Sequence, residues 1–218
     1  MNRVIKIFAV VLGMALLNAC SAYQGPQGPQ GVTGAAGPIQ TLPTPSGTLT
    51  VAQLVAEQNA YRESVGQEDL IPGLNCALYT VPQTTTQIIG ATLTGVGNFE
   101  MEGAFNTMNQ SVNVGMNFFP TSIQPIFTTW YVVKCTGNLV MAYSDWHGFA
   151  LSSDDGSNLY VDGLLINNDG LHGIQTKTAV KFLEYGFHSF ELDFLQGSGN
   201  EALILGMDNA LLNSGFYH

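Results

Sequence analysis

Apolar and polar residues alternate with a period of two along much of the chain after residue 130, as they do in strands with one buried face. In one such run three apolar residues fall on one face and three polar residues on the other: Phe190, Leu192 and Phe194 against Ser189, Glu191 and Asp193. Glu201 to Met207 forms a last long run, and turns rich in Gly and Asn separate the runs. The pattern predicts an all-β fold, a sandwich or barrel, over residues 73–218, which suffice for one sizeable core.

A different periodicity precedes the strands. Thr50 and Gln53 have the spacing of a capping box, in which each residue hydrogen-bonds the backbone of the other. Apolar residues then recur at near-helical intervals up to Val65, and Gly66 is a natural stop. One helix is therefore predicted over residues 50–66. It is too short for three clean heptads, so packing against the β-domain is favoured over a trimer neck.

The N-terminus has the features of an export signal. Arg3 and Lys6 precede the apolar run Ile7 to Leu17, which is too short to span a bilayer. The segment ends in Leu-Asn-Ala-Cys, which resembles a bacterial lipobox, so residues 1–19 are predicted to be removed and Cys20 to be lipidated. The alternative is an ordinary signal peptide that happens to carry a cysteine. Ser21 after the lipidated cysteine favours the outer membrane of the cell envelope.

Residues 20–49 contain five triplets from Gly25 onward with Gly at every third place. Collagen needs this spacing because only Gly fits at the axis of three packed chains. The segment is predicted to be a stalk, and two readings remain open: a homotrimeric triple helix, or a polyproline-like spacer on a single chain.

Charge limits the classes of partner. Removing Arg3 and Lys6 leaves four basic residues, Arg62, Lys134, Lys177 and Lys181, against 16 acidic ones, so the exported chain carries a net charge near −12. Nucleic acid is therefore excluded as an expected partner, since phosphate binding depends on Lys and Arg. Multivalent cations and neutral sugars remain. The sequence also lacks the common motifs of hydrolases, metalloproteases and phosphate-binding loops, so no enzyme is expected.

Two cysteines remain once Cys20 is lipidated. Cys76 and Cys135 both lie on strand-like runs, and an exported chain folds in an oxidising compartment. A structural disulfide between them is predicted.

The stretch from Phe149 to Gly173 contains the main candidate ligand and binding residues of the chain. It contains Ser153-Asp154-Asp155-Gly156-Ser157, then a Leu-Tyr-Val-Asp-Gly run over residues 159–163, then Asp169-Gly170-Leu171-His172-Gly173. Asp162-Gly163 favours a tight hairpin turn. In order and spacing these segments resemble the PA-fourteen domain, a family named after the protective antigen of anthrax toxin, and the later Leu183 to Leu192 run resembles the family's Leu-x-x-Gly-x-His strand. The resemblance covers the chain from about Cys76 onward and implies a β-barrel-like sandwich.

The resemblance also implies a site. Sugar-binding members of the family, yeast flocculins and epithelial adhesins among them, hold calcium with an Asp-Asp pair joined by a cis peptide bond. Carried over, Asp154 and Asp155 become calcium ligands, and the loop at residues 196–200 is expected to supply more, with Asn200 first and Gln196 second. Calcium accepts 6–8 oxygen ligands and exchanges waters, so a sugar diol can replace two of them. The alternative is that Ser-Asp-Asp-Gly-Ser is only a β-turn.

Three further residues are candidates with competing interpretations. Asp169 and His172 lie in the second signature loop of the resemblance, either as ligands of the site or, as is favoured, as hydrogen-bonded braces of the loop, with a metal ligand as the less favoured role. Trp146 either borders the site as a sugar platform or packs at the rim of the core. The sequence thus predicts a lipid-anchored surface protein that binds a glycan through calcium, for adhesion or recognition. The alternative is a structural or trimerising head without a ligand.

Overall fold

The computed structural model describes residues 49–101, 105–109, 128–212 and 214–218. The predicted signal peptide, the lipidation of Cys20 and all but the last residue of the stalk predicted at residues 20–49 lie outside the described residues. In the described part of the chain, no helix has the length and apolar character that a membrane span requires.

The helix, α2 (Val51–Ser64), begins where the capping-box spacing predicted. The Thr50 side chain accepts a hydrogen bond from the Gln53 backbone, and the Gln53 side chain accepts one from the Thr50 backbone. The helix ends at the C-cap residue Val65, and Gly66 follows with a φ of 72°. Its buried residues Leu54 and Val55 pack in one cluster with Val140, so the helix covers part of the β-domain, as predicted.

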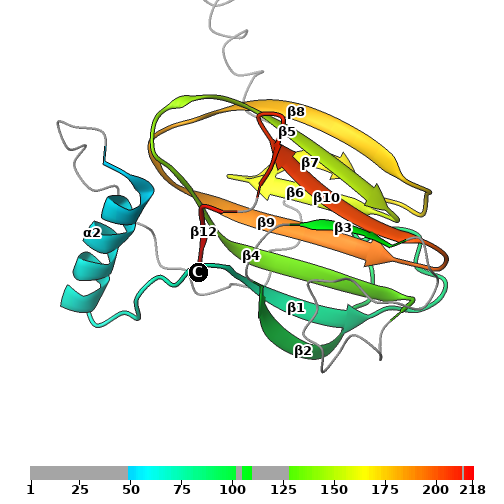
Figure 1. Ribbon diagram of the computed structural model, residues 1–218. Helices are drawn as coiled ribbons and strands as arrows, with labels where there is room; N and C mark the ends of the chain where they lie inside the picture. The colour runs from blue at the N-terminus through cyan, green and yellow to red at the C-terminus, as the bar shows by residue number, and fades with distance from the viewer. Residues whose placement is uncertain (1–48, 102–104, 110–127, 213) are drawn as a thin grey trace, which may run out of the picture. The chain divides into compact units, whose positions relative to one another are not determined.

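The remaining described elements are strands in two antiparallel sheets (Figure 1). The first sheet, which we call sheet A, has the order β2-β1-β4-β9-β6-β7, with β12 also paired to β4. The second, sheet B, has the order β11-β10-β5-β8, with β3 also paired to β10. The bounds are β1 (Leu74–Thr80), β2 (Thr94–Met101), β3 (Asn106–Asn109), β4 (Tyr131–Met141), β5 (Asp145–Asp154), β6 (Ser157–Val161), β7 (Leu164–Asn168), β8 (Gln175–Leu183), β9 (Gly186–Gln196), β10 (Glu201–Met207), β11 (Ala210–Leu211) and β12 (Phe216–Tyr217).

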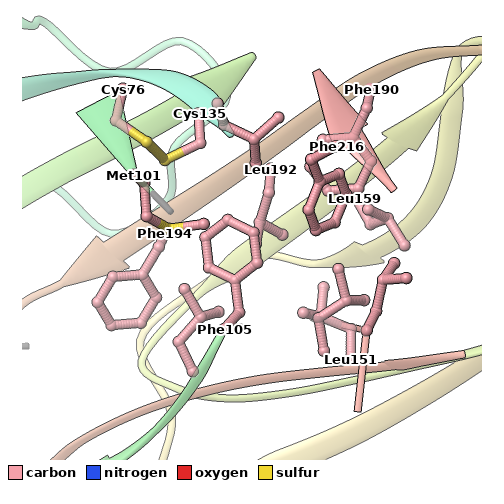
Figure 2. Packing of buried hydrophobic residues seen from close by; sticks show 14 of the residues in the cluster. Cys76, Met101, Phe105, Cys135, Leu151, Leu159, Phe190, Leu192, Phe194 and Phe216 are labelled. Atoms are coloured by element: carbon pink, nitrogen blue, oxygen red, sulfur yellow. A yellow bond between two sulfur atoms is a disulfide. The ribbon is translucent and has the colours of Figure 1, made fainter. Parts of the chain in front are cut away.

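The hydrophobic core lies between the two sheets. The residues that the alternating pattern predicted to be buried point into it. Phe190, Leu192 and Phe194 of β9 are buried there, as the sequence pattern predicted. Figure 2 shows them packed with Leu159 of sheet A and Leu151 of sheet B. The all-β sandwich expected from the sequence is therefore confirmed, with one helix before it.

The predicted disulfide forms across neighbouring strands. Cys76 of β1 and Cys135 of β4 are directly opposite in the strand register, and their sulfurs are bonded. Both cysteines are buried beside the core phenylalanines (Figure 2).

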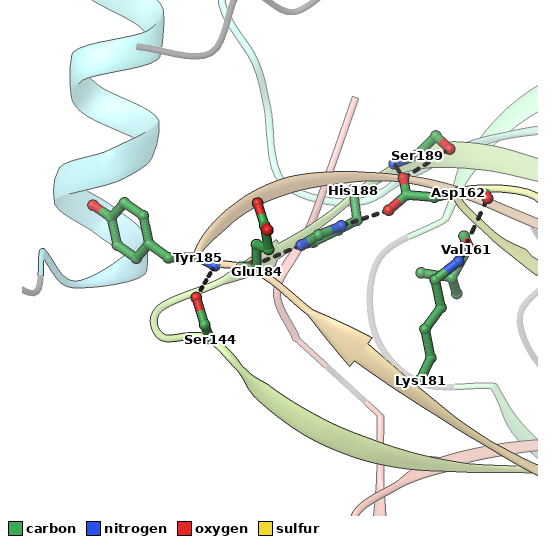
Figure 3. A network of polar contacts seen from close by, with 8 residues as sticks. All are labelled: Ser144, Val161, Asp162, Lys181, Glu184, Tyr185, His188 and Ser189. Atoms are coloured by element: carbon green, nitrogen blue, oxygen red, sulfur yellow. Dashed lines mark hydrogen bonds and ion pairs between the residues drawn. The ribbon is translucent and has the colours of Figure 1, made fainter. Parts of the chain in front are cut away.

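A polar latch holds the turn between β6 and β7. Asp162 and Gly163 have φ values of 46° and 105°, which fits the predicted Asp-Gly hairpin. One Asp162 oxygen contacts the His188 ring at 2.6 Å, and the other accepts the Ser189 N–H at 2.9 Å. The Lys181 amine donates to the Val161 carbonyl, so β8 and β9 both hold this turn (Figure 3).

We expect removal of the disulfide to destabilise the domain. With Cys76→Ala and Cys135→Ala together, the unfolded chain loses a constraint between positions separated by 59 residues, and the loop-closure term is about 4 kcal/mol. Guanidinium unfolding of the double variant measures the loss in free energy of unfolding. A loss below ~1 kcal/mol would show that the bridge constrains the unfolded chain very little.

The polar latch at Asp162 predicts that the stability of the domain depends on pH. Partial burial alone would raise the pKa of Asp162, but the hydrogen bonds from His188 and Ser189 and the charge of His188 lower it overall. Because the folded pKa lies below the unfolded one, this stabilisation is present above the ordinary carboxyl pKa and is lost as the pH falls through the folded pKa. Asp162→Asn should therefore lower the unfolding free energy at neutral pH and have less effect in strong acid. Urea unfolding at both pH values tests this, and an equal loss at both would contradict it.

Candidate functional site

The two adjacent aspartates lie where β5 leaves sheet B. Asp154 is the last residue of β5 and pairs in register with Ala202 of β10, while Asp155 begins the turn into β6. The peptide bond between them is cis, as the family resemblance implied. Gly156 follows in close contact with a second loop. A Cβ at this position would lie 2.6 Å from the Gly170 carbonyl oxygen, so no other residue type fits the turn.

Asp155 joins this turn to two other loops. Its side chain is buried. One carboxylate oxygen accepts the His172 N–H at 3.1 Å, and the other accepts the Gly197 N–H at 2.8 Å. The first donor belongs to the loop after β7, and the second to the loop between β9 and β10. The three loops therefore converge on one carboxylate, and Asp154 lies beside it with its side chain only partly buried.

The local electrostatics disfavour two negative charges here. Burial raises the pKa of Asp154, and the neighbouring charge of Asp155 raises it further; His172 and the Ile174 N–H oppose the rise without reversing it. Burial likewise raises the pKa of Asp155, even though the N–H groups of Gly197 and His172 stabilise its charged form. A bound cation would stabilise both ionised carboxylates, because an opposite charge nearby favours the charged form.

The side chain of Gln196 holds the loop at residues 196–200 through a hydrogen bond within the loop. Gln196 is fully buried, and its amide nitrogen donates to the Asn200 carbonyl oxygen at 3.0 Å. Its own amide oxygen is buried without a hydrogen-bond partner among the described residues. The sequence proposed Gln196 as the second-choice ligand, whereas here its buried amide nitrogen braces the loop. Asn200 is exposed at the end of the same loop, on the side open to solvent.

Asp169 is also a brace in this structure. Its two oxygens accept the backbone N–H groups of Ile88 at 2.7 Å and Ile89 at 3.0 Å, and it accepts the Gly170 N–H at 2.9 Å. It thereby fastens the segment 82–93 to the loop that holds Asp155. Of the two interpretations left open by the sequence, this geometry supports the hydrogen-bonded brace over direct contact with a ligand.

Trp146 does not lie near the aspartates, which corrects the expectation that it borders the site. It is the second residue of β5, whereas Asp154 is the last. Eight residues of strand at about 3.3 Å each separate the two by roughly 26 Å. The Trp146 side chain is 66% exposed, and its ring lies 5.6 Å from the Phe182 ring. The expectation failed because the extended strand β5 runs between the two residues and places them at its opposite ends.

Sequence reasoning missed an aromatic residue that does adjoin the site. The Trp130 N–H donates to the Gly197 carbonyl oxygen at 2.9 Å, and a Cβ built on Gly197 would lie 3.8 Å from the Trp130 ring. Trp130 has a φ of 58°, a left-handed conformation uncommon for a bulky residue and found often at functional sites. No sequence signal could have found it, because Trp130 reaches the site through a backbone hydrogen bond to a residue 67 positions later in the chain.

The donor set fits calcium. Asp154 and Asp155 offer carboxylate oxygens, and the facing loop offers backbone carbonyls and the Asn200 amide oxygen, all of them the hard ligands that calcium prefers. Each Asp155 oxygen that accepts one N–H keeps a second lone pair. Within the described ranges, no group of three His, Cys, Asp or Glu side chains is placed to hold a metal, so a cation here would depend on two carboxylates and on neutral oxygens.

Comparison with known proteins gives a likeness in fold. No protein-family profile and no curated protein matches this sequence. Among solved structures, the PA14 sugar-binding domain of an RTX adhesin has a TM-score of 0.53 at 21% identity, over 66% of this chain and 94% of that domain. The epithelial adhesin 6 A domain of Candida glabrata, in complex with Galβ1-3GlcNAc, has a TM-score of 0.50 at 13% identity, over 67% and 86%.

A third likeness is to an anti-sigma factor domain-containing protein, with a TM-score of 0.50 at 20% identity over 63% of this chain. The match spans 43% of that protein's length. At these identities the comparisons establish the fold, a PA14-like sandwich. The two adhesin domains among them are binding domains.

We expect Asp169→Ala to loosen the segment 82–93, because it leaves the Ile88 and Ile89 N–H groups without their acceptor. Ile88 is buried, and an amide left unsatisfied in a buried place costs about 1–3 kcal/mol, whereas Ile89 is 48% exposed and its N–H can bond water. Hydrogen exchange across residues 82–93 should quicken and the unfolding free energy should fall. Asp169→Asn, which keeps one acceptor oxygen, should lose less. If Asp169→Ala instead removes cation binding and leaves exchange unchanged, Asp169 is a ligand and not a brace.

Proposed function

We propose that the rim made by Asp154, Asp155 and the loop at residues 196–200 binds calcium and, through it, a carbohydrate. The observation that carries the proposal is the convergence of three loops on the Asp155 carboxylate, which sets a second carboxylate, Asp154, beside a loop of neutral oxygens. Calcium bound there would offer coordination positions that two hydroxyls of a sugar can fill.

The surroundings of the rim suit a neutral sugar. Leu171 is 43% exposed and Ile174 is 56% exposed, both in the loop that contacts the aspartates. Trp130 lies against the other loop. Apolar and aromatic side chains beside polar ligands can contact the C–H faces of a sugar ring. Two of the structurally similar proteins, an RTX adhesin domain described as sugar-binding and an adhesin domain in complex with Galβ1-3GlcNAc, support a glycan as the ligand class.

In the proposed site, different residues of the chain would hold the loops, coordinate the ion and contact the sugar. Asp155 and Gln196 hold the loops, Asp154 and Asn200 supply oxygens on the open side, and Trp130 and Leu171 border the sugar. On a lipid-anchored stalk, as the first 49 residues predict, such a head would serve adhesion or recognition.

A head without a ligand is the second candidate, and one observation favours it. Both oxygens of Asp155 already accept backbone N–H groups, as they would in a turn that needs no ion. Calcium binding separates the two candidates, because only the first requires it.

The test is isothermal titration of calcium into the full chain, followed by a glycan array with and without a chelator. With two charged ligands we expect a dissociation constant of roughly 0.1–1 mM, as in extracellular calcium modules. Array signals should disappear with chelator. No calcium heat and no array signal would support the structural head, and calcium heat without any array signal would limit the ion to a structural role.

Asp154→Asn is the informative variant, since Asp155→Ala would also release two loops. Loss of one charged ligand should weaken calcium at least about tenfold, or about 1.4 kcal/mol, and remove the glycan signal. Asp145→Asn, at the other end of β5, is the matched control because Asp145 accepts only the Trp146 N–H among the described contacts. Equal calcium affinity in Asp154→Asn and the wild type would contradict the proposal.

A further inference from the structure

Two exposed aromatic side chains meet on the outer face of sheet B. Trp146 of β5 is directly opposite Phe182 of β8 in the strand register, and their ring centroids lie 5.6 Å apart. Trp146 is 66% exposed and Phe182 is 44% exposed. The alternate residues of β5, such as Phe149 and Leu151, lie in the core, so the two rings face away from it. Exposed apolar groups that lie together often mark a surface where a ligand or a partner binds.

A hollow adjoins this aromatic pair, over the strands β10, β5 and β8 that lie side by side (Figure 1). Its volume is about 570 Å³, within the range of about 300–1,000 Å³ that ligand pockets have. Gly148 and Val180, the next pair along β5 and β8 on this face, line it together with Ala150 and Gly206. A Cβ at Gly148 would meet nothing within 4 Å, so the fold itself leaves room for a side chain there. Glycine inside a strand can mark a place where a ligand approaches the backbone closely.

The chemistry of the hollow suits a neutral sugar. Ser152 and Thr178 offer hydroxyl groups, and no Lys, Arg or Glu among the described residues lines it. Its one carboxylate, Asp208, already contacts the His147 ring at 2.6 Å and accepts the Gly148 N–H at 2.9 Å. Sugar hydroxyls can pair with polar groups of this kind, while an aromatic ring contacts the apolar C–H face of the sugar.

The hollow also continues toward the rim proposed to bind calcium. Asp154 lies on the same face of β5 as Ser152, Ala150 and Gly148, because residues two apart in a strand share a face. On this face of β5, only those three small residues separate Asp154 from Trp146. The two ends are roughly 26 Å apart. A single sugar on the calcium cannot reach Trp146, whereas a linear chain of sugars can.

We propose that the ligand is a linear, neutral oligosaccharide that runs from the calcium rim along β5 to the aromatic pair. The inference rests on the calcium-dependent sugar site proposed above and adds the class of ligand, an extended chain in place of a single terminal unit. One end is held at Asp154 through calcium, the middle lies in the hollow, and Trp146 and Phe182 contact a distant sugar. Continuity with the rim is the observation that favours a glycan over a second copy of the chain on this face.

The two tryptophans of the chain test the proposal, because they lie at opposite ends of the path. Trp130→Phe leaves Trp146 as the single tryptophan, and Trp146→Phe leaves Trp130 beside the rim. The full chain is titrated in calcium with disaccharides of galactose, glucose and mannose, and with longer linear chains of the same units. Long glycans should change the emission of both tryptophans, whereas a disaccharide should change only that of Trp130. A Trp130 signal that responds to long glycans, with an unchanged Trp146 signal, would overturn the proposal.

Two variants test the path itself. Gly148→Val places a strand-compatible side chain in the hollow, and Trp146→Ala removes the far aromatic ring. Each should lower the affinity for long glycans about tenfold relative to the affinity for disaccharides, as measured by calorimetry. Gly97→Val, on β2 of sheet A, is the matched control because a Cβ there also meets nothing within 4 Å, and it should keep the wild-type ratio. Circular dichroism checks that each variant folds. A wild-type ratio in Trp146→Ala and in folded Gly148→Val would contradict the proposal.

Failure of the calcium site has a different signature. If the wild-type chain binds calcium but no glycan of any length, the sugar part of the proposed function fails and this inference fails with it. Glycan binding that survives a chelator and is lost in Trp146→Ala would overturn the continuous path from the rim. Light scattering covers the remaining occupant: self-association of the wild type that Trp146→Ala abolishes, with glycan affinity unchanged, would assign this face to a second copy of the chain.

Discussion

The Asp155 carboxylate accepts backbone N–H groups from two loops that are distant in sequence, and the shape of the rim depends on this pair of bonds. His172 and Gly197 supply the donors, so the turn after β5 and the loops after β7 and β9 hold one another. Gly156 and Gly197 allow the approach, because a Cβ at either would meet atoms of the neighbouring loop within 3.0 Å. Asp169 extends the arrangement by fastening the segment 82–93 to the same loop.

The domain has two places where carboxylates lose contact with water, and they differ in what accompanies the charge. On the outer face of sheet A, Lys134 lies between Asp193 and Glu191, so an amine partners the buried acid. At the rim, the aspartate pair has backbone N–H groups and His172 but no lysine or arginine among its described contacts. The cost of burying charge is therefore offset by an ion pair in one place and points to a bound cation in the other.

The sequence predicted those features that depend on local chemistry. The capping box, the Asp-Gly hairpin, the cross-strand disulfide and the alternation along β9 each follow from residue types at short spacing. Contacts through the backbone could not be predicted, because any residue can supply an N–H. The partners of Asp169, at Ile88 and Ile89, and the approach of Trp130 to Gly197 are of this kind. Trp146 was misplaced because an extended strand separates residues that are only eight positions apart, and Trp146 lies at the opposite end of β5 from Asp154.

A crystal structure grown with calcium tests the central claim most directly, by anomalous scattering at the rim. The account predicts one peak at about 2.3–2.6 Å from oxygens of both Asp154 and Asp155. Further oxygens from residues 196–200 should complete the coordination, with Asn200 among them. A structure with saturating calcium, no peak at this position, and the two carboxylates contacted only by backbone N–H groups and water would contradict it.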